Sequence, residues 1–299
     1  MPELPDVTVY VESIAARVAG QPLLKVRAAS PFVVRTFDPP LSAAAGKKVL
    51  QVSRLGKRIV FTLEDGLFLV IHLMIAGRFK WLEAGAKIPA KVGLAALDFP
   101  SGTLLMTEAA TKKRASIHLA RSLDEFRRSG IEPLECTEEE FASALRRENH
   151  TLKRALTDPR LFSGIGNAYS DEILHRAKLS PALLTAKMSE AEVRAVDQST
   201  RAVLGEWTAR LREEARDRFP EKVTAFREDF AVHGKYRKPC PVCKTSVQRI
   251  AYADNETNYC PRCQTGGKLL SDRSLARLLH DDWPRTIEEL EERFPAPRK

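Results

Sequence analysis

The chain has 299 residues, a formal net charge of +9 and an ordinary apolar fraction of 43%. Its length allows one large domain or two to three small ones. The longest apolar stretch, 67–77, is too short to cross a bilayer, and the N-terminus lacks the basic and apolar regions of a secretory signal. The basic balance raises the odds of a polyanionic partner without deciding the matter, because many basic proteins bind none.

The first part of the chain, over roughly 130 residues, is predicted to be mostly β from its alternation of apolar and polar residues. A helix is expected over 7–19, with Gly20 as its C-cap. Four strands are expected as two hairpins, 58–63 with 67–74 and 92–99 with 103–108. A helix beside a strand-rich unit indicates a β-sandwich with helical decoration.

Helical patterns follow Cys136, the one cysteine that stands apart from the others. Thr137 and Glu140 form a capping-box pattern at the first of these helices. The expected helices cover 137–147, 151–157, 167–177 and 189–217. A further short helix is expected over 271–279, ended by Trp283-Pro284.

The sharpest break among these helices is 164–167, Gly-Ile-Gly-Asn. Its glycines allow close backbone approach, and the free N–H groups of the following helix start suit a phosphate. An ordinary corner capped by Asn167 explains the same residues, with Asp171 and Glu172 as acids of the helix's first turn. The local sequence alone favours the ordinary corner.

Cysteines at Cys240, Cys243, Cys260 and Cys263 have the spacing of a structural metal site. Each Cys-x-x-Cys pair forms a knuckle, and two knuckles supply the closed tetrahedral set of thiolates that zinc prefers. Such a set leaves no open coordination position. We therefore expect one structural zinc ion that folds this small module and does no chemistry.

The N-terminus begins Met-Pro-Glu. If Met1 is removed, Pro2 presents a secondary amine whose pKa lies below that of lysine. This amine condenses with a sugar C1′ to give an iminium, and Glu3 is placed to move protons. Many chains begin in this way, so the dipeptide alone is weak support.

In combination, these segments resemble the formamidopyrimidine-DNA glycosylase and endonuclease VIII family. The resemblance runs from residue 1 to about 264. At position 4, the leucine is more similar to the formamidopyrimidine branch than to the endonuclease VIII branch. It rests on the order and spacing of five segments: 1–6 (Met-Pro-Glu-Leu-Pro-Asp), 56–58 (Gly-Lys-Arg), 72–77 (His-Leu-Met-Ile-Ala-Gly), 161–172 (Leu-Phe-Ser-Gly-Ile-Gly-Asn-Ala-Tyr-Ser-Asp-Glu) and 232–235 (Val-His-Gly-Lys) leading into Cys240.

The resemblance implies an α+β multi-domain fold. The parts would be an N-terminal β-sandwich catalytic domain at 1–135, a helix–two-turn–helix domain at 136–231, and a zinc finger with a tail at 232–299. The partner would be damaged double-stranded DNA, bound by a monomer in the cytoplasm or at the nucleoid, with no membrane contact.

The same resemblance assigns roles to residues. Pro2 would be the Schiff-base nucleophile and Glu3 the acid/base, while Lys57 would contact the phosphate beside the lesion. The remaining DNA-contacting positions would be His72, Ile75, Lys113, Arg114, Lys153, Asn167 and Lys235. Pro2 would displace the damaged base, and β-elimination, with or without a second elimination, would cut the strand.

This chain departs from the family pattern at several places. Asn255 stands where the family has a finger arginine, and Ile75 stands where the formamidopyrimidine branch has Met. The Arg-Phe pair expected near 113–115 lacks its Phe, although Ile75 remains an apolar residue able to enter the base stack. The tail at 264–299 extends past the family's usual end, and docking of a short helix explains it better than a new activity.

Two alternatives stay open at this point. The departures favour a narrower enzyme, an AP lyase or a pyrimidine-lesion glycosylase. A zinc-finger protein that binds damaged DNA without cutting it is the other alternative, and a retained Met1 would favour it because the proline amine must be free.

Overall fold

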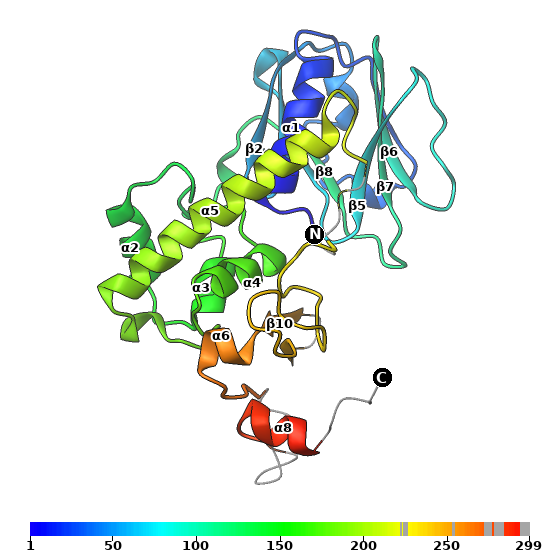
Figure 1. The fold of residues 1–299 in the computed structure, drawn as a ribbon. Coiled ribbons are helices and arrows are strands. Elements are labelled where there is room, and N and C mark those ends of the chain that lie inside the picture. Colours follow the sequence, from blue (N-terminus) through cyan, green and yellow to red (C-terminus); the bar gives the residue numbers. More distant parts are fainter. Residues whose placement is uncertain (222, 224–226, 253–254, 272–276, 278–283, 294–299) are drawn as a thin grey trace. The chain divides into compact units, whose positions relative to one another are not determined.

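The structure is a computed structural model that describes residues 1–221, 223, 227–252, 255–271, 277 and 284–293. The chain divides into two compact units, Met1–Arg128 with Gly205–Ala225, and Ser129–Leu204 with Phe226–Lys299. The boundary at 204/205 falls within helix α5 (Glu190–Ala215). Figure 1 traces the elements of each unit along the chain. The three-part division drawn from the sequence remains a prediction.

The first unit contains two four-stranded antiparallel sheets. One has the order β1-β6-β7-β5 and the other β2-β3-β4-β8. The strands of the first sheet are β1 (Lys25–Ala28), β5 (Gly77–Leu82), β6 (Gly93–Phe99) and β7 (Gly102–Glu108). Those of the second are β2 (Val49–Leu55), β3 (Arg58–Leu63), β4 (Phe68–His72) and β8 (Ser116–Ala120).

Alternation along the strands creates the core of this unit. On β3, Ile59 and Phe61 enter a large cluster that also takes in side chains of the other sheet, such as Leu97 and Leu104. Val60 points the other way, into a smaller cluster with Phe126. The predicted β-sandwich is therefore confirmed, with each sheet burying one face against the other.

Helix α1 (Leu4–Val18) begins three residues before its predicted start. Glu3 is its N-cap, and its backbone N–H donates to Oδ2 of Asp6 at 2.9 Å in a capping box. Pro5 in the first turn fits a helix start, where a missing N–H costs nothing. The residues just after the N-terminus are thus fixed by the helix that follows them.

The second unit is helical with a small zinc-finger-like hairpin. Its α-helices are α2 (Glu138–Arg146), α3 (Leu152–Thr157), α4 (Asn167–Arg176), the first part of α5, α6 (Pro261–Thr265) and α8 (Ile287–Arg293). The hairpin pairs β9 (Gln248–Tyr252) with β10 (Asn255–Tyr259). Short 3-10 helices occur in both units. The first unit contains η1 (Pro31–Val33), η2 (Leu41–Ala44), η3 (Glu64–Gly66) and η4 (Asp124–Phe126), and the second contains η5 (Thr185–Lys187).

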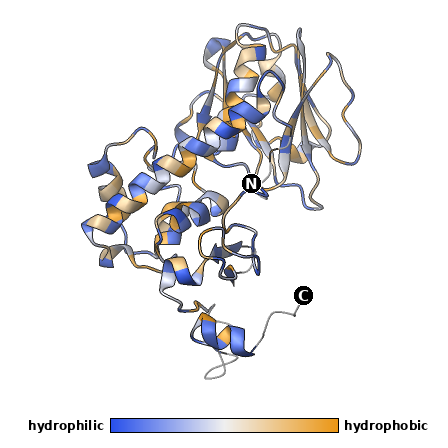
Figure 2. Cartoon of the chain, in the orientation of Figure 1, coloured by the Kyte–Doolittle hydropathy of each residue, from blue (hydrophilic) through white to orange (hydrophobic). Residues whose placement is uncertain are grey.

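Capping and amphipathicity explain the helices. Thr137 and Glu140 form the predicted capping box, with Glu140 N–H donating to Thr137 Oγ1 at 3.2 Å. Along α5 hydrophilic and hydrophobic residues alternate (Figure 2), as expected for a helix that buries one side. Among the described residues, no helix combines the length and the apolar composition of a membrane span.

The tail is described only in part. Most of the helix expected over 271–279 lies outside the described residues. The described part returns to α6, where Ile287 N–H donates to Gly267 O and Leu269 N–H donates to Arg285 O, both at 2.9 Å. Ile287 opens α8 and is fully buried. The tail therefore packs as an extension of the finger, in keeping with the expected docking of a short helix.

Candidate active site and metal centre

The N-terminus of the chain is buried. Pro2 is buried and Glu3 is only 2% exposed. Burial lowers the pKa of the N-terminal amine, carried here by Met1, and the charges of Arg78 and Lys57 add to this shift, whereas Glu3 and Asp6 oppose it. An amine at this end of the chain is therefore more often neutral near pH 7 than a free one, and a neutral amine is a nucleophile.

Lys57 lies in the tight turn between β2 and β3, where Gly56 adopts a left-handed φ of +62°. Its neighbour Arg58 pairs across the sheet with His72, the last residue of β4. Burial, then Arg58 and Lys57, lower the pKa of His72 to about 4. This shift favours the neutral imidazole ring of His72 at pH 7.

Ile75 lies on a tight turn between β4 and β5. Met74 adopts a left-handed φ of +53°, and a Cβ on Gly77 would lie 2.2 Å from Leu73 O, so only glycine fits at that point. The turn leaves Ile75 52% exposed. The predicted wedge is thus held out from the sheet by its backbone.

A second segment leaves β7, the strand that pairs with β5. Gly77 at the start of β5 pairs with Glu108 at the end of β7. The loop that follows Glu108 carries Lys113 and Arg114, both exposed. The turn of Ile75 and the loop of Lys113 and Arg114 therefore adjoin one residue pair of β5 and β7, Gly77 and Glu108.

In the second unit, the loop of Gly164 and Gly166 leads into α4 as predicted. Asn167 is the first helical residue, and its Nδ2 donates to Glu256 O on β10 at 2.7 Å. Lys153 Nζ on α3 donates to Asn167 O at 2.6 Å and to Asp171 Oδ1 at 2.5 Å. Lys153, Asn167 and the finger hairpin therefore form one connected group.

The interpretation of Asp171 and Glu172 as first-turn acids is wrong. Both lie beyond the first turn of α4, and Asp171 is fully buried. Its Oδ2 accepts from His233 Nδ1 at 2.8 Å and from Asn258 N–H at 3.1 Å. Glu172 accepts the backbone N–H groups of three successive residues before the finger, Ala231, Val232 and His233, at 2.7 to 2.9 Å.

The consequence of these contacts is a finger tied to α4 by two buried carboxylates. Burial raises the pKa of Glu172, and the three N–H groups oppose that shift. Neighbours in sequence could not have revealed this role, because the partners lie 59 to 87 residues further along the chain.

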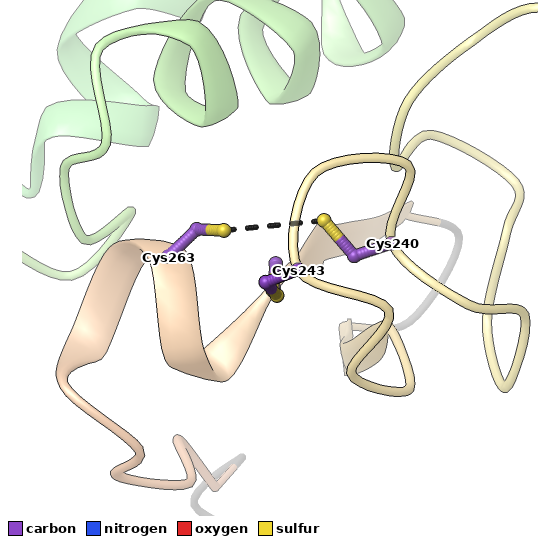
Figure 3. Close-up of side chains that lie close together, drawn as sticks. Cys240, Cys243 and Cys263 are labelled. Atoms are coloured by element: carbon purple, nitrogen blue, oxygen red, sulfur yellow. Dashed lines mark hydrogen bonds between the residues drawn. The ribbon is translucent and has the colours of Figure 1, made fainter.

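The four cysteines predicted to bind metal come together. Their Sγ atoms all lie within 4.8 Å of one another, with Cys240 and Cys263 3.9 Å apart and Cys243 and Cys260 3.3 Å apart. Figure 3 shows the sulfur atoms of Cys240 and Cys263 facing each other, with Cys243 beside them. Tetrahedral Zn–S bonds place sulfur atoms about 3.8 Å apart, so these residues fit a structural metal ion.

A second layer supports this set. His175 Nε2 on α4 lies 3.3 Å from Cys240 Sγ, and burial lowers the pKa of His175, so a neutral ring with a proton on Nε2 can donate to the sulfur. Such outer donors fix the orientation of metal ligands. The spacing of the cysteines could not predict a role for His175, because this residue lies 65 positions before Cys240 in the sequence.

The basic flank of the finger is partly engaged within the protein. Lys235 Nζ donates to Glu228 O at 2.6 Å. Arg249 on β9 lies over the ring of Tyr236 at 4.4 Å and pairs with Glu256 at 3.2 Å. Asn255 begins β10 and is exposed, so the finger presents Arg249 rather than an arginine at position 255.

Sequence models of known families match three parts of the chain: the formamidopyrimidine-DNA glycosylase N-terminal domain at 1–124, its H2TH domain at 130–213, and the zinc finger found in FPG and IleRS at 237–266. The formamidopyrimidine-DNA glycosylase of Solibacter usitatus is 32% identical over 273 residues, which cover 88% of this chain and 99% of the relative. The chain belongs to the formamidopyrimidine-DNA glycosylase family. The enzyme of that name from Thermus thermophilus is 34% identical, over 89% of this chain and all of the relative.

Solved structures agree with this membership. The Lactococcus lactis Fpg in complex with DNA that contains an abasic site superposes with a TM-score of 0.77 at 26% identity, over 88% of this chain and 99% of that one. Full-length relatives of the formamidopyrimidine-DNA glycosylase family thus leave about a tenth of this chain unmatched.

Proposed function

We propose that this protein is a bifunctional DNA glycosylase and AP lyase of base excision repair, acting on oxidised or ring-opened bases in duplex DNA. The observation that carries the proposal is the burial of Pro2 beside the buried Glu3 at the N-terminus, in a chain of the formamidopyrimidine-DNA glycosylase family. In the same unit, Lys57 would supply a cation for the DNA phosphate beside the lesion. His72 would supply a neutral ring that can form a hydrogen bond with the DNA.

The reaction starts after removal of Met1. The damaged nucleotide leaves the stack, because its C1′ is unreachable within a duplex. The Pro2 nitrogen forms a bond to C1′, the bond from C1′ to the base breaks, and the base leaves with a proton. Glu3 is placed to move protons during this exchange and the opening of the sugar.

The resulting iminium is an electron sink. Loss of a proton from C2′ then breaks the C3′–O bond by β-elimination and cuts the strand, and a second elimination can release the sugar. Water hydrolyses the iminium and restores the proline amine. No step needs a metal ion, in line with a cysteine set that leaves no open coordination position.

DNA binding is assigned to residues of both units. Ile75, Lys113 and Arg114 would enter or flank the gap left by the flipped base, and Lys153, Asn167 and Lys235 would serve the phosphates. The bonds of Lys153 to Asp171 and Asn167 suggest that it acts chiefly by holding the start of α4, whose N–H groups would face a phosphate. The ion held by the four cysteines would be zinc, and the protein would act as a monomer at chromosomal DNA.

The division into an N-terminal catalytic domain at 1–135, a helix–two-turn–helix domain at 136–231 and a finger with its tail at 232–299 is proposed as the functional one. It keeps the reacting amine in one part and the phosphate-binding helix start in the next.

A second candidate is a narrower enzyme, an AP lyase or a pyrimidine-lesion glycosylase. It is favoured by the loop 109–115, whose sequence Ala-Ala-Thr-Lys-Lys-Arg-Ala contains no large apolar residue to fill a gap in the stack. Single-turnover cleavage of duplexes with 8-oxoguanine, thymine glycol or an abasic site separates the candidates. Excision of 8-oxoguanine supports the broad glycosylase, whereas cleavage of the abasic or thymine glycol duplex alone supports the narrower enzyme.

A further inference from the structure

Glu108 is a buried acid that the proposed reaction does not use. It is the last residue of β7 and is only 1% exposed. Its Oε2 atom accepts the backbone N–H of Arg114 at 2.9 Å and that of Ala115 at 3.1 Å. Lys113 Nζ donates to the backbone oxygen of the same residue. One side chain at the root of the loop therefore holds its far end.

The loop needs such an anchor. Lys112, Lys113 and Arg114 are consecutive exposed cations that repel one another, whereas Ala115 beside them is buried. A run of this kind would otherwise be solvated and variable in conformation. One acceptor oxygen that takes two backbone N–H groups fixes the backbone of the loop at this point.

The position of Glu108 relates the loop to the turn of Ile75. Glu108 pairs with Gly77, the glycine that ends this turn, and Thr107 pairs with Arg78. Arg78 Nη1 donates to Ile75 O at 3.2 Å and to Gly77 O at 2.6 Å. The two segments are thus anchored on adjoining residues of β5 and β7.

We propose that Glu108 is the positioning residue of this loop. It holds the cations at 112–114 beside the Ile75 turn, so that an apolar tip and a basic loop meet damaged duplex DNA as one rigid surface. This inference rests on the proposed function for the identity of the DNA partner. The role of Glu108 is to fix backbone, and it touches no reacting atom.

Trypsin tests the anchoring directly, because it cleaves after each of the three basic residues. Glu108→Ala should raise the cleavage rate at 112–114 by at least about tenfold, since it removes two bonds to a charged acceptor. Glu108→Gln should stay near the wild-type rate, because both bonds use one oxygen that an amide carbonyl can replace. Glu64→Ala is the matched control, since Glu64 accepts the N–H of Lys48 in another hairpin of the same unit.

The functional arm compares two substrates. Glu108→Ala should lower kcat/KM on a lesion within duplex DNA by about tenfold or more, and leave cleavage of a single-stranded abasic oligonucleotide within about twofold, because single strands have no gap to fill. Glu108→Gln should restore duplex activity. Melting curves check that each variant folds. If Glu108→Ala does not, Glu108→Asp replaces it, since this acid is one methylene shorter and withdraws from both N–H groups.

The outcomes are separable. Wild-type tryptic rates in Glu108→Ala, a Glu108→Gln protein that behaves like Glu108→Ala, or equal losses on duplex and single-stranded DNA would each overturn the positioning role. The measurement of tryptic cleavage does not depend on catalysis by this protein. An inactive wild-type protein would therefore contradict the proposed function, while the test of anchoring by Glu108 would remain valid.

Discussion

Lys153 Nζ lies 2.5 Å from Oδ1 of Asp171, a carboxylate with no exposed surface. The same carboxylate accepts from His233 and Asn258, which lie on the finger side of the chain. A lysine expected to meet phosphate is therefore also the counter-ion of the acid that joins α4 to the finger. Cohesion of the second unit therefore depends on the charge of Lys153.

Removing that charge should cost stability. Lys153→Met leaves Asp171 buried and without its cation, which we expect to lower the free energy of unfolding by about 3–5 kcal/mol. Lys153→Met combined with Asp171→Asn should recover part of this loss, because no unpaired charge remains. Urea unfolding of the second unit measures both, with Glu288→Gln as the control. Glu288 pairs with Arg262 at the surface, so its loss should cost less than about 1 kcal/mol. Equal effects of Lys153→Met and Glu288→Gln would contradict the buried role.

Folding stability should fall in acid partly through His72. Its pKa is about 4 in the fold against 6.5 ordinarily, so the folded state resists a proton that the unfolded chain accepts. This contribution is complete above pH 6.5 and is lost as the pH falls toward 4, by up to about 3 kcal/mol. His72→Gln should flatten the stability profile across that window. A profile that keeps its wild-type slope would show that His72 titrates normally.

Arg78 should set the acid limb of the reaction. Burial lowers the pKa of the Met1 amine, and the charge of Arg78 adds to this shift. We expect the same direction at the Pro2 amine once Met1 is removed, so Arg78→Ala should raise that pKa and move the acid limb of kcat/KM to higher pH. Arg78→Lys keeps a cation and should leave the limb nearer to the wild-type position. The pH profile on an abasic duplex measures the shift. A limb that moves equally in both variants would assign the effect to the turn that Arg78 supports.

Metal removal should act on the finger alone. Cys260→Ser, or a chelator strong enough to strip zinc, should unfold the module around β9 and β10 and weaken DNA binding, because so small a unit cannot fold without its metal. Hydrogen exchange should show protection lost in the finger and kept in the sandwich. Attack by the Pro2 amine and the following elimination need no metal ion. Cleavage of a single-stranded abasic oligonucleotide should therefore persist at high enzyme concentration. Unchanged DNA affinity after complete zinc loss would refute the role of the finger.

Local pattern predicted much of this fold. Hairpins, the capping box of Thr137 and the cysteine knuckles are each encoded within a few residues, so periodicity and turn chemistry suffice to find them. The start of α1 was missed because Glu3 caps it in place of a typical Ser or Asp. The site residues Asp171, Glu172, His175 and Glu108 look locally like ordinary surface groups. Their roles come from partners distant in sequence or from loop closure, which a single sequence does not display.

Borohydride trapping tests most directly whether the N-terminal proline is the nucleophile. Purified protein confirmed by intact mass to lack Met1 is incubated with abasic and 8-oxoguanine duplexes, beside Pro2→Gly and the control Glu64→Ala. We expect a covalent protein–DNA adduct with wild type and Glu64→Ala that is strongly reduced in Pro2→Gly. An adduct of undiminished yield in Pro2→Gly would place the nucleophile elsewhere, and no adduct on either duplex would mean that the protein binds damaged DNA without cutting it.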